Sequence, residues 1–315
     1  MSDRLRIATR GSALALWQAN HVRTLLEGCG RTIELVEVST IGDRDKATAL
    51  SDLGETSRGG SGESTQGVFT KEVQRVVLDG DADLAVHSLK DLPTEPTPDL
   101  VLAAVPERGD IDDALCLPRD SELAVLDDLP AGSRIGTGSP RRVAMLRRAR
   151  PNLECVPIRG NVPTRLAKLD AGEFDAIVLA CAGLRRLDLA DRITARLGGD
   201  LMWPAVGQAA LGLECRADDD LTQAVLGMID HEDSARCVDA ERALLRTLRA
   251  GCGAAVGVRT RVVGERLDLA ARILSLDGTD ELVDEAEGDR DDAASIGRRL
   301  AERLLERGAG DLIAT

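Results

Sequence analysis

Arginine side chains gather in one stretch of this chain, between residues 134 and 168. Nine basic residues, eight of them arginine, stand there against a single acid, Glu154, although the whole chain of 315 residues holds 40 basic and 54 acidic residues. Arginine presents a planar fork that binds a carboxylate or phosphate through two parallel hydrogen bonds. Because the local charge is opposite to that of the chain, we expect this stretch to bind an anion.

The arginines of this stretch differ in their surroundings. Arg147, Arg148 and Arg150 are as compatible with a solvated helix face as with a site. Ligand binding is favoured for the four that stand beside turn-forming Gly, Ser, Pro or Asn, since binding residues are concentrated on loops: Arg141, Arg142, Arg159 and Arg165.

A lysine and an aspartate follow a predicted buried strand over residues 82–87, in the run His87-Ser88-Leu89-Lys90-Asp91. Ligands of open α/β sheets bind beyond the carboxyl ends of the strands. A carboxylate at Asp91 could move a proton or stabilise a cation there. A turn-capping Asp91 beside a solvated Lys90 explains this segment alone equally well.

One cysteine, Cys252, stands between two glycines at the end of a predicted long helix over residues 234–249. Glycines leave room beside the sulfur for a bulky group, which favours a loaded or reactive thiol. A small cysteine in a tight turn is the structural alternative. A thiol hydrolase that pairs Cys252 with His87 is a third, although nothing local orients such a pair.

The composition argues against several classes of protein. With two Trp, two Phe, no Tyr and a net charge of -14, the chain lacks the aromatic platforms and positive charge of single-strand nucleic-acid binders. It lacks a run of about 20 apolar residues and an apolar signal segment, so we expect a cytoplasmic protein without a membrane partner. Seven cysteines without a Cys-x-x-Cys pair and three dispersed histidines predict neither disulfides nor a metal site.

Lysine is scarce: only four of the 40 basic residues are Lys, and acids are abundant. This bias suggests a halophilic source, and a plain acidic mesophilic enzyme is the alternative. High salt screens the repulsion among surface acids but also weakens exposed ion pairs. We therefore expect the anion-binding arginines at positions 141, 142, 159 and 165 to be partly enclosed and to bind carboxylates bidentately.

Short apolar strands alternate with amphipathic helices, which predicts an α/β fold with parallel sheets and helices on both faces. Strands are expected over 4–9, 32–40, 82–87, 153–158 and 176–180, and helices over about 13–26, 70–78, 163–171 and after Ser139. Ser12 caps the first helix, which carries Leu14, Trp17, His21 and Leu25 on one stripe. The low-complexity segment 54–66 is expected to be a mobile loop.

The pattern changes after about residue 230. The helix over 234–249 precedes turn signals at Gly264 and Gly278, and a last helix carries Ile296, Leu300 and Leu304 at four-residue spacing. This predicts a separate small α+β domain. No internal repeat is evident in the sequence.

Taken together, the motifs resemble the porphobilinogen deaminase family, also called hydroxymethylbilane synthase. They stand in family order between residues 4 and 258: Arg6-Ile7-Ala8-Thr9-Arg10-Gly11-Ser12, His87-Ser88-Leu89-Lys90-Asp91-Leu92-Pro93, Gly136-Thr137-Gly138-Ser139-Pro140-Arg141-Arg142, Arg159-Gly160-Asn161-Val162, Pro204-Ala205-Val206-Gly207-Gln208, Ala240-Glu241-Arg242 and Gly251-Cys252.

The resemblance implies two binding-protein-like doubly wound α/β domains and a small α+β C-terminal domain. Domain 1, with the catalytic aspartate, would comprise residues 1–107 and 208–228. Domain 2, rich in arginine, would comprise residues 108–207. Domain 3, with the cofactor-bearing cysteine, would comprise residues 229–315.

The resemblance also implies a transferase of tetrapyrrole (heme, siroheme and cobamide) biosynthesis, which would act as a monomer. Four porphobilinogen molecules are joined head to tail with loss of ammonia, and water releases hydroxymethylbilane. The primer is a dipyrromethane cofactor bound through a thioether to Cys252. An anion-binding or sensor module of the binding-protein class is the alternative, but such a module has no use for Asp91 or a loaded Cys252.

Matching by motif assigns a role to each site residue. The catalytic carboxylate is Asp91. The residues implied to bind the cofactor are Cys252, Lys90, Asp91, Thr137, Ser139, Arg141 and Arg142. Those implied to bind substrate carboxylates are Arg10, Ser12, Lys71, Arg159, Arg165 and Arg186.

The sequence departs from the family pattern in two places. The family usually shows Gly-Lys-Gly-Leu-Phe before the helix at Lys71, but Gln66 stands here where that lysine is expected. Lys71 or Arg58 would substitute for it. After residue 258 little matches, so the third domain is assigned by its position.

Overall fold

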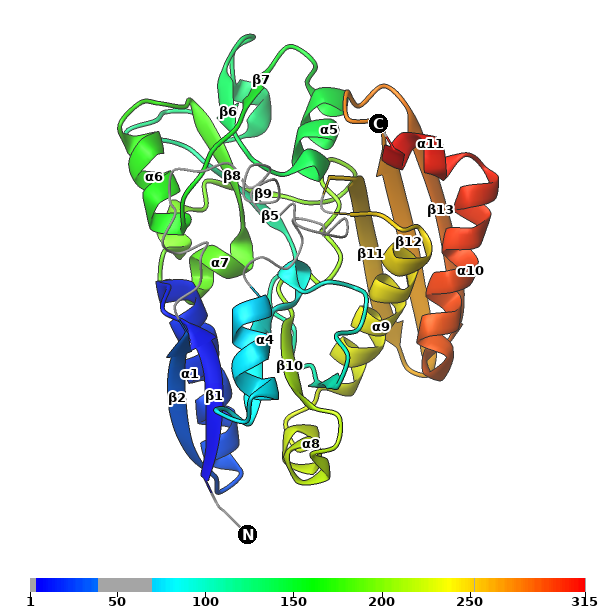
Figure 1. Cartoon of the computed structure of the whole chain (residues 1–315). Helices are drawn as coiled ribbons and strands as arrows, with labels where there is room; N and C mark the ends of the chain where they lie inside the picture. Colours follow the sequence, from blue (N-terminus) through cyan, green and yellow to red (C-terminus); the bar gives the residue numbers. More distant parts are fainter. Residues whose placement is uncertain (1–3, 39–69, 252, 315) are drawn as a thin grey trace, which may run out of the picture. The chain divides into compact units, whose positions relative to one another are not determined.

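The computed structural model describes residues 4–38, 70–251 and 253–314. The chain divides into two compact units (Figure 1). The first unit comprises Met1–Arg108 and Ala210–Ala235, and the second comprises Gly109–Ala209 and Arg236–Thr315. The boundaries of three domains, expected from the resemblance, remain a prediction.

The first unit is built on a five-stranded sheet of order β2-β1-β3-β10-β4. Its strands are β1 (Arg4–Arg10), β2 (Thr32–Val38), β3 (Leu84–Ser88), β4 (Leu100–Ala104) and β10 (Leu211–Arg216). Strand β1 runs parallel to β2 and β3, whereas β10 runs antiparallel to both β3 and β4. The sheet is therefore mixed and not purely parallel as expected.

Helices cover both faces of this sheet. They are α1 (Ala13–Gly28), α4 (Lys71–Leu78) and α8 (Asp220–Gly227). Ile7 packs on one face with Leu26 of α1 and Leu226 of α8, and Ala8 packs on the other face with Val77 of α4. Apolar residues at alternate strand positions thus supply two cores, as in a doubly wound fold.

The second unit contains a five-stranded sheet of order β7-β6-β8-β5-β9. Its strands are β5 (Asp113–Cys116), β6 (Arg134–Gly136), β7 (Glu154–Val156), β8 (Ala176–Ala180) and β9 (Ala195–Leu197). Strand β6 is parallel to β7 and β8, and β5 is antiparallel to β8 and β9. Helix α5 (Pro140–Ala149) covers one face, and α6 (Val162–Asp170) and α7 (Cys181–Arg186) cover the other.

The two five-stranded sheets share one arrangement. In each sheet three parallel strands lie side by side, and the one that comes first in the chain, β1 or β6, is in the middle. An antiparallel strand, β10 or β5, follows, and β4 or β9 forms the edge. The antiparallel strand β10 comes later in the chain than the parallel strands of its sheet, and β5 comes earlier than those of its own. The units therefore repeat a topology that the sequence does not show as a repeat.

The second unit also contains a three-stranded antiparallel sheet of β11 (Ala255–Val263), β12 (Arg266–Leu274) and β13 (Glu281–Asp289). Gly264 and Gly278 lie in the two turns with φ of 60° and 78°, which glycine adopts without steric cost. Helix α10 (Ala293–Glu306) buries its predicted stripe against this sheet with α9 (Glu232–Thr247), and α11 (Ala309–Ala314) packs on β12. The described residues also form the 3-10 helices η1 (Leu89–Asp91), η2 (Leu126–Asp128), η3 (Ala190–Arg192) and η4 (Arg290–Asp292).

The expected helices and strands are present within a few residues of their predicted ends, but the prediction of which face of α1 is buried was wrong. Ser12 caps α1 as predicted, and its hydroxyl accepts a hydrogen bond from the Ala15 amide at 3.3 Å. The fully buried residues of α1, however, are Gln18, Ala19, Val22 and Leu26. The stripe of Leu14, Trp17, His21 and Leu25 is only half-buried, because the helix turns the neighbouring stripe to the sheet. The expected loop over 54–66 lies outside the described residues.

Candidate active site

A small pocket of the first unit brings three predicted site residues together. Its volume is about 80 Å³, and its lining includes Arg10, Ser12 and Asp91. Arg10 is the last residue of β1, Ser12 caps α1, and Asp91 follows β3 in η1. The carboxyl ends of β1 and β3 are neighbours because these strands are parallel, so the pocket lies where ligands of α/β sheets bind.

Two buried leucines anchor the turn that carries Asp91. Leu89 and Leu92 are 1% and 3% exposed, and the Leu92 amide donates to the Leu89 carbonyl at 3.2 Å. The Leu89 amide donates to the Ala210 carbonyl at 3.1 Å, which ties the turn to the chain before β10. Asp91 is exposed between these anchors, and Lys90 precedes it in the same turn. The turn can therefore hold the carboxylate at the pocket.

A buried polar cluster lies against the same pocket. His87 lines it, and the His87 Nε2 atom lies 3.0 Å from Glu214 Oε2. The amide of Gln74 donates to Glu214 Oε2 at 2.8 Å and to the Thr97 hydroxyl at 3.0 Å. Sequence reasoning missed Glu214 and Gln74, although a lone acid in the apolar run Leu211–Arg216 was a usable signal. His87 faces this carboxylate, and Cys252, its partner in the hydrolase alternative, lies outside the described residues.

The two arginines after Ser139 point into the core of the second unit. Arg141 and Arg142 are 4% and 6% exposed, and both bind Asp113 of β5. Arg141 Nη2 lies 2.8 Å from Asp113 Oδ2, and Arg142 Nη2 lies 2.7 Å from Asp113 Oδ1. Burial alone would raise the pKa of the Asp113 carboxyl, but the charges of Arg142 and Arg141 lower it to about 2. The chain's own carboxylate thus occupies the arginine forks.

The remaining contacts of the two guanidinium groups go mostly to backbone carbonyls. Arg142 Nη1 donates to the Val178 carbonyl at 2.8 Å, and Arg141 Nη1 donates to the Trp203 carbonyl. Burial lowers the pKa of Arg141. Among the described residues, nothing accepts a hydrogen bond from the buried Arg141 Nε.

The loop before α5 places two more predicted residues beside this arginine pair. Thr137 is buried, and its backbone amide donates to the Val156 carbonyl at 2.9 Å. The Thr137 hydroxyl accepts from the Ser139 amide at 3.3 Å. Ser139 is the N-cap of α5 and makes no side-chain capping bond, so its hydroxyl is not used to cap the helix.

The other predicted binding residues do not share one environment. Arg159 is exposed and Arg165 is half-buried, with Arg165 Nε donating to the Gly160 carbonyl at 2.7 Å. The expectation that Arg159 is enclosed is therefore wrong for this structure. Arg186 Nη2 donates to the Ala209 carbonyl at 2.6 Å, and burial lowers its pKa to about 10. Lys71 is the exposed first residue of α4, directly after Thr70 of the pocket lining.

Cys252 and Gln66 lie outside the described residues. The flanking glycines are described, and a Cβ atom placed on either Gly251 or Gly253 would meet no described atom within 4 Å. The described backbone on both sides of Cys252 is therefore uncrowded.

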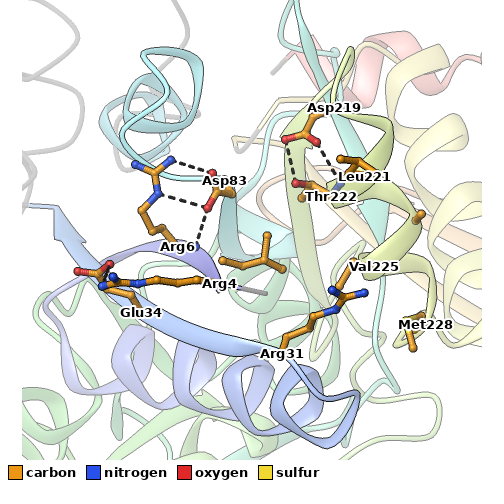
Figure 2. Close-up of a pocket in the computed structure, with 12 residues that line it drawn as sticks. Arg4, Arg6, Arg31, Glu34, Asp83, Asp219, Leu221, Thr222, Val225 and Met228 are labelled. Carbon is orange, nitrogen blue, oxygen red and sulfur yellow. Dashed lines mark hydrogen bonds and ion pairs between the residues drawn. The ribbon is translucent and has the colours of Figure 1, made fainter. Parts of the chain in front are cut away.

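A larger pocket of the first unit contains none of the predicted residues. It measures about 620 Å³ and lies at the opposite, amino-terminal ends of β1 and β3, against α8 (Figure 2). Figure 2 shows that its charges largely face one another: Arg6 binds Asp83 at 2.8 Å, and Arg4 binds Glu34 at 2.5 Å. Its charged rim is thus compensated within the chain, so pocket size does not locate the chemistry here.

Comparison with known families decides the assignment. Residues 5–224 match the family model of the porphobilinogen deaminase dipyromethane cofactor binding domain, and residues 235–306 match that of the porphobilinogen deaminase C-terminal domain. The chain belongs to the porphobilinogen deaminase family. Porphobilinogen deaminase of Xanthomonas oryzae pv. oryzae is 45% identical over 98% of both chains. That of Geobacter sulfurreducens is 42% identical over 99% of this chain and 94% of the relative.

Solved structures to which the chain is similar include two binding proteins. The methionine-binding protein MetQ is 12% identical, with a TM-score of 0.44 over 73% of this chain and 91% of that chain. The aliphatic sulphonate binding protein SsuA of Escherichia coli is 15% identical, with a TM-score of 0.39 over 79% of this chain and 71% of that chain.

Porphobilinogen deaminases are hydroxymethylbilane synthases, so the chain is a transferase of tetrapyrrole biosynthesis with a domain for the dipyrromethane cofactor. The residues present fit such a group, which carries carboxylate side chains. The evidence is the buried arginine pair at the start of α5, with one donor, Arg141 Nε, that no described residue satisfies. Within the described ranges we find no cluster of three or more His, Cys, Asp or Glu side chains suited to a metal ion, and no helix long and apolar enough to span a membrane.

Proposed function

We propose that Asp91 is the catalytic carboxylate of the family's reaction, the head-to-tail joining of four porphobilinogen molecules. The observation that carries this proposal is the pocket that Asp91 shares with Arg10 and Ser12 at the carboxyl ends of β1 and β3. A cation-stabilising carboxylate and a carboxylate-binding arginine are the two groups that porphobilinogen requires, because it is a pyrrole with acetate and propionate side chains.

Each condensation breaks one carbon–nitrogen bond and forms one carbon–carbon bond. The amino group of porphobilinogen leaves as ammonia, and the methylene carbon that carried it becomes the exocyclic carbon of a cationic azafulvene. The free α-carbon of the growing chain attacks the exocyclic carbon of this cation and then loses its proton. Asp91 stabilises the cation through its negative charge and handles the protons that move in the two steps.

The binding residues neutralise the substrate's carboxylates. Arg10 lies at the pocket with Asp91, and Ser12 supplies a donor at the start of α1. Arg159, Arg165, Arg186 and Lys71 bind the carboxylates of a chain that grows more anionic with each addition. Arginine suits this role because its fork binds a carboxylate bidentately.

The cofactor is held through a thioether to Cys252 and by Lys90, Asp91, Thr137, Ser139, Arg141 and Arg142. When bound, it supplies the free pyrrole α-carbon to which the first substrate is joined. Two features support the proposal: the uncrowded glycines around Cys252, and the arginine pair at the start of α5. The final product is released by water, which restores the enzyme with its cofactor.

We propose further that the enzyme works as a monomer in the cytoplasm of a salt-adapted organism. Six described cysteines are free thiols, which suits a reducing compartment. The scarcity of lysine and the excess of acids support salt adaptation.

The binding-module alternative is weaker. The match to the family runs through the cofactor-binding domain and the C-terminal domain, whereas the alternative accounts for the first two domains alone.

Intact-protein mass and turnover test the proposal together. The purified parent should weigh more than its sequence by two linked pyrroles and should convert porphobilinogen to hydroxymethylbilane. Cys252→Ala should fold, as judged by its melting curve, but carry no added mass and show no turnover. A bare parent that binds carboxylates without turnover would support the binding module, and an adduct on Cys215 or Cys237 would remove Cys252 from the assignment.

A further inference from the structure

One carboxylate holds both buried arginines at the start of α5. Asp113 is the first residue of β5, and its side chain is fully buried. Its Oδ2 atom accepts from Arg141 Nη2, and its Oδ1 atom accepts from Arg142 Nη2 at 2.7 Å and Nε at 3.2 Å. Gln208 Nε2 donates to the same Oδ1 at 3.1 Å and to the Ile111 carbonyl at 2.6 Å. Asp113 is thereby fixed from three sides.

The charges of this cluster do not cancel. The guanidinium groups of Arg141 and Arg142 carry two positive charges, and the Asp113 carboxylate carries one negative charge. One net positive charge is therefore buried. The arginines hold the pKa of Asp113 at about 2, so the carboxylate is ionised at neutral pH. Without it, two like charges would be buried side by side, an arrangement that low-dielectric surroundings strongly disfavour.

We assign the excess positive charge to Arg141, because its Nε donor has no described acceptor. Arg142 is bound by Asp113 and by the Val178 carbonyl, while the buried Arg141 Nε lacks a described acceptor. Ser139 leaves the N-terminus of the ten-residue helix α5 without a side-chain cap, so its first amides add to the positive potential there. Arg141 is therefore already oriented, and its Nε atom is the donor left for a further acceptor.

We infer that Asp113 is a positioning residue for the cofactor: it neutralises Arg142, fixes both guanidinium groups, and leaves the single positive charge of Arg141 for a cofactor carboxylate. This inference rests on the proposed function. Asp113 itself touches neither substrate nor cofactor, and it acts only through the two arginines.

A second buried arginine of the same unit provides a matched control. Arg192 is 5% exposed and binds Asp170 bidentately at 2.9 and 2.7 Å. This pair has one charge of each sign and no excess positive charge. Asp170→Asn and Asp113→Asn therefore make the same chemical change at the carboxylate partners of buried arginines, although Asp170 is 36% exposed and Asp113 is fully buried. Only Asp113 adjoins the predicted cofactor residues.

The experiment compares the two variants by intact mass and by melting temperature. We expect Asp170→Asn to melt at a lower temperature but to carry the two-pyrrole mass excess in full. Asp113→Asn should carry it in a fraction of molecules about ten-fold smaller or less, because losing one charged contact of this kind is worth at least about 1.4 kcal/mol. Asp113→Glu keeps the charge and should restore most of the loading, which a role in packing alone would not require.

A third variant covers the case in which Asp113→Asn does not fold. Gln208→Ala keeps all three charges but removes the amide that fixes Asp113. Apoprotein produced without porphobilinogen should then gain the mass excess several-fold more slowly than parent apoprotein on adding porphobilinogen.

The inference is overturned if Asp113→Asn carries the two-pyrrole mass excess in the same fraction of molecules as the parent. It is also overturned if Asp170→Asn, at an equal loss of melting temperature, loses as much of the mass excess as Asp113→Asn. Parent-like loading by Gln208→Ala would overturn it as well. A parent protein that never carries the mass excess would instead refute the proposed function.

Discussion

Replacing Asp91 by asparagine removes one negative charge from the pocket that it shares with Arg10 and Ser12 and keeps the size of the side chain. Asp91 is held at the pocket by the buried Leu89 and Leu92, so the replacement should leave the fold intact. If the cofactor is attached through the proposed thioether to Cys252, it should remain bound in this variant. The variant therefore isolates the effect of the charge on turnover.

The size of this effect follows from the position of the carboxylate. A cation about 4 Å from a carboxylate at a protein surface, with an effective dielectric constant of about 20, gains about 4 kcal/mol. That is about three powers of ten in rate at about 1.36 kcal/mol each. Because Asp91 is exposed, solvent screens part of this energy, and we expect kcat to fall by about 10²–10³-fold.

The assay is steady-state turnover of porphobilinogen, with intact mass to verify the cofactor. Glu95→Gln is the matched control, since Glu95 is an exposed carboxylate four residues further along that does not line the pocket. We expect the control to keep the kcat and the mass excess of the parent. If Asp91→Asn retains its cofactor and turns over within about two-fold of the parent, the charge does not stabilise the rate-limiting cation.

Three other outcomes test the structure more broadly. The depressed pKa of Asp113 contributes stability that is present above pH 3.8 and lost as the pH falls toward 2, so the advantage of the parent over Asp113→Asn in unfolding free energy should shrink by about 2 kcal/mol across that window. A constant difference in denaturant titrations would contradict the buried ion pairs. Gly297→Ala should cost about 1–3 kcal/mol, because its Cβ would overlap the Ala240 carbonyl oxygen of α9. Gly227→Ala, whose Cβ meets no described atom within 4 Å, should be neutral or slightly stabilising, and equal melting temperatures for the two variants would refute the close approach of α9 and α10. Raising KCl from low to molar concentration should raise the melting temperature, because salt screens the repulsion among surface acids; a melting temperature that does not change with salt would refute salt adaptation.

Elements that depend on local pattern could be predicted from the sequence. The all-apolar run Ala176–Ala180 is strand β8 at its predicted bounds, and the turns at Gly264 and Gly278 are present. Ser12 caps its helix, and Arg10, Ser12 and Asp91 meet at one pocket because parallel strands align their carboxyl ends.

Features that depend on distant partners could not be predicted. Strand β10 is buried along five of its six residues, and its antiparallel place is set by β3 and β4, more than a hundred residues earlier in the chain. The arginine cluster predicts binding of an anionic ligand, which stays a prediction, and no local pattern revealed that Asp113 fills the forks of Arg141 and Arg142. The helix α1 turns Gln18 inward against the expectation from hydrophobicity, because burial is set by the sheet beneath it.

The contact between His87 and Glu214 also helps to fix the register of β10 against its neighbours β3 and β4. Leu213 and Cys215 enter the core beside α1 and α8, while Glu214 points to the opposite face, where His87 and Gln74 meet it. A slip of β10 by one residue would exchange these faces and place the Glu214 carboxylate among leucines and valines. Such a slip would keep the backbone hydrogen bonds between the strands, but it would bury the charge of Glu214 without a partner, which is very costly. The buried cluster beside the pocket of Asp91 thus also fixes the register of a strand whose sheet partners lie more than a hundred residues earlier in the chain.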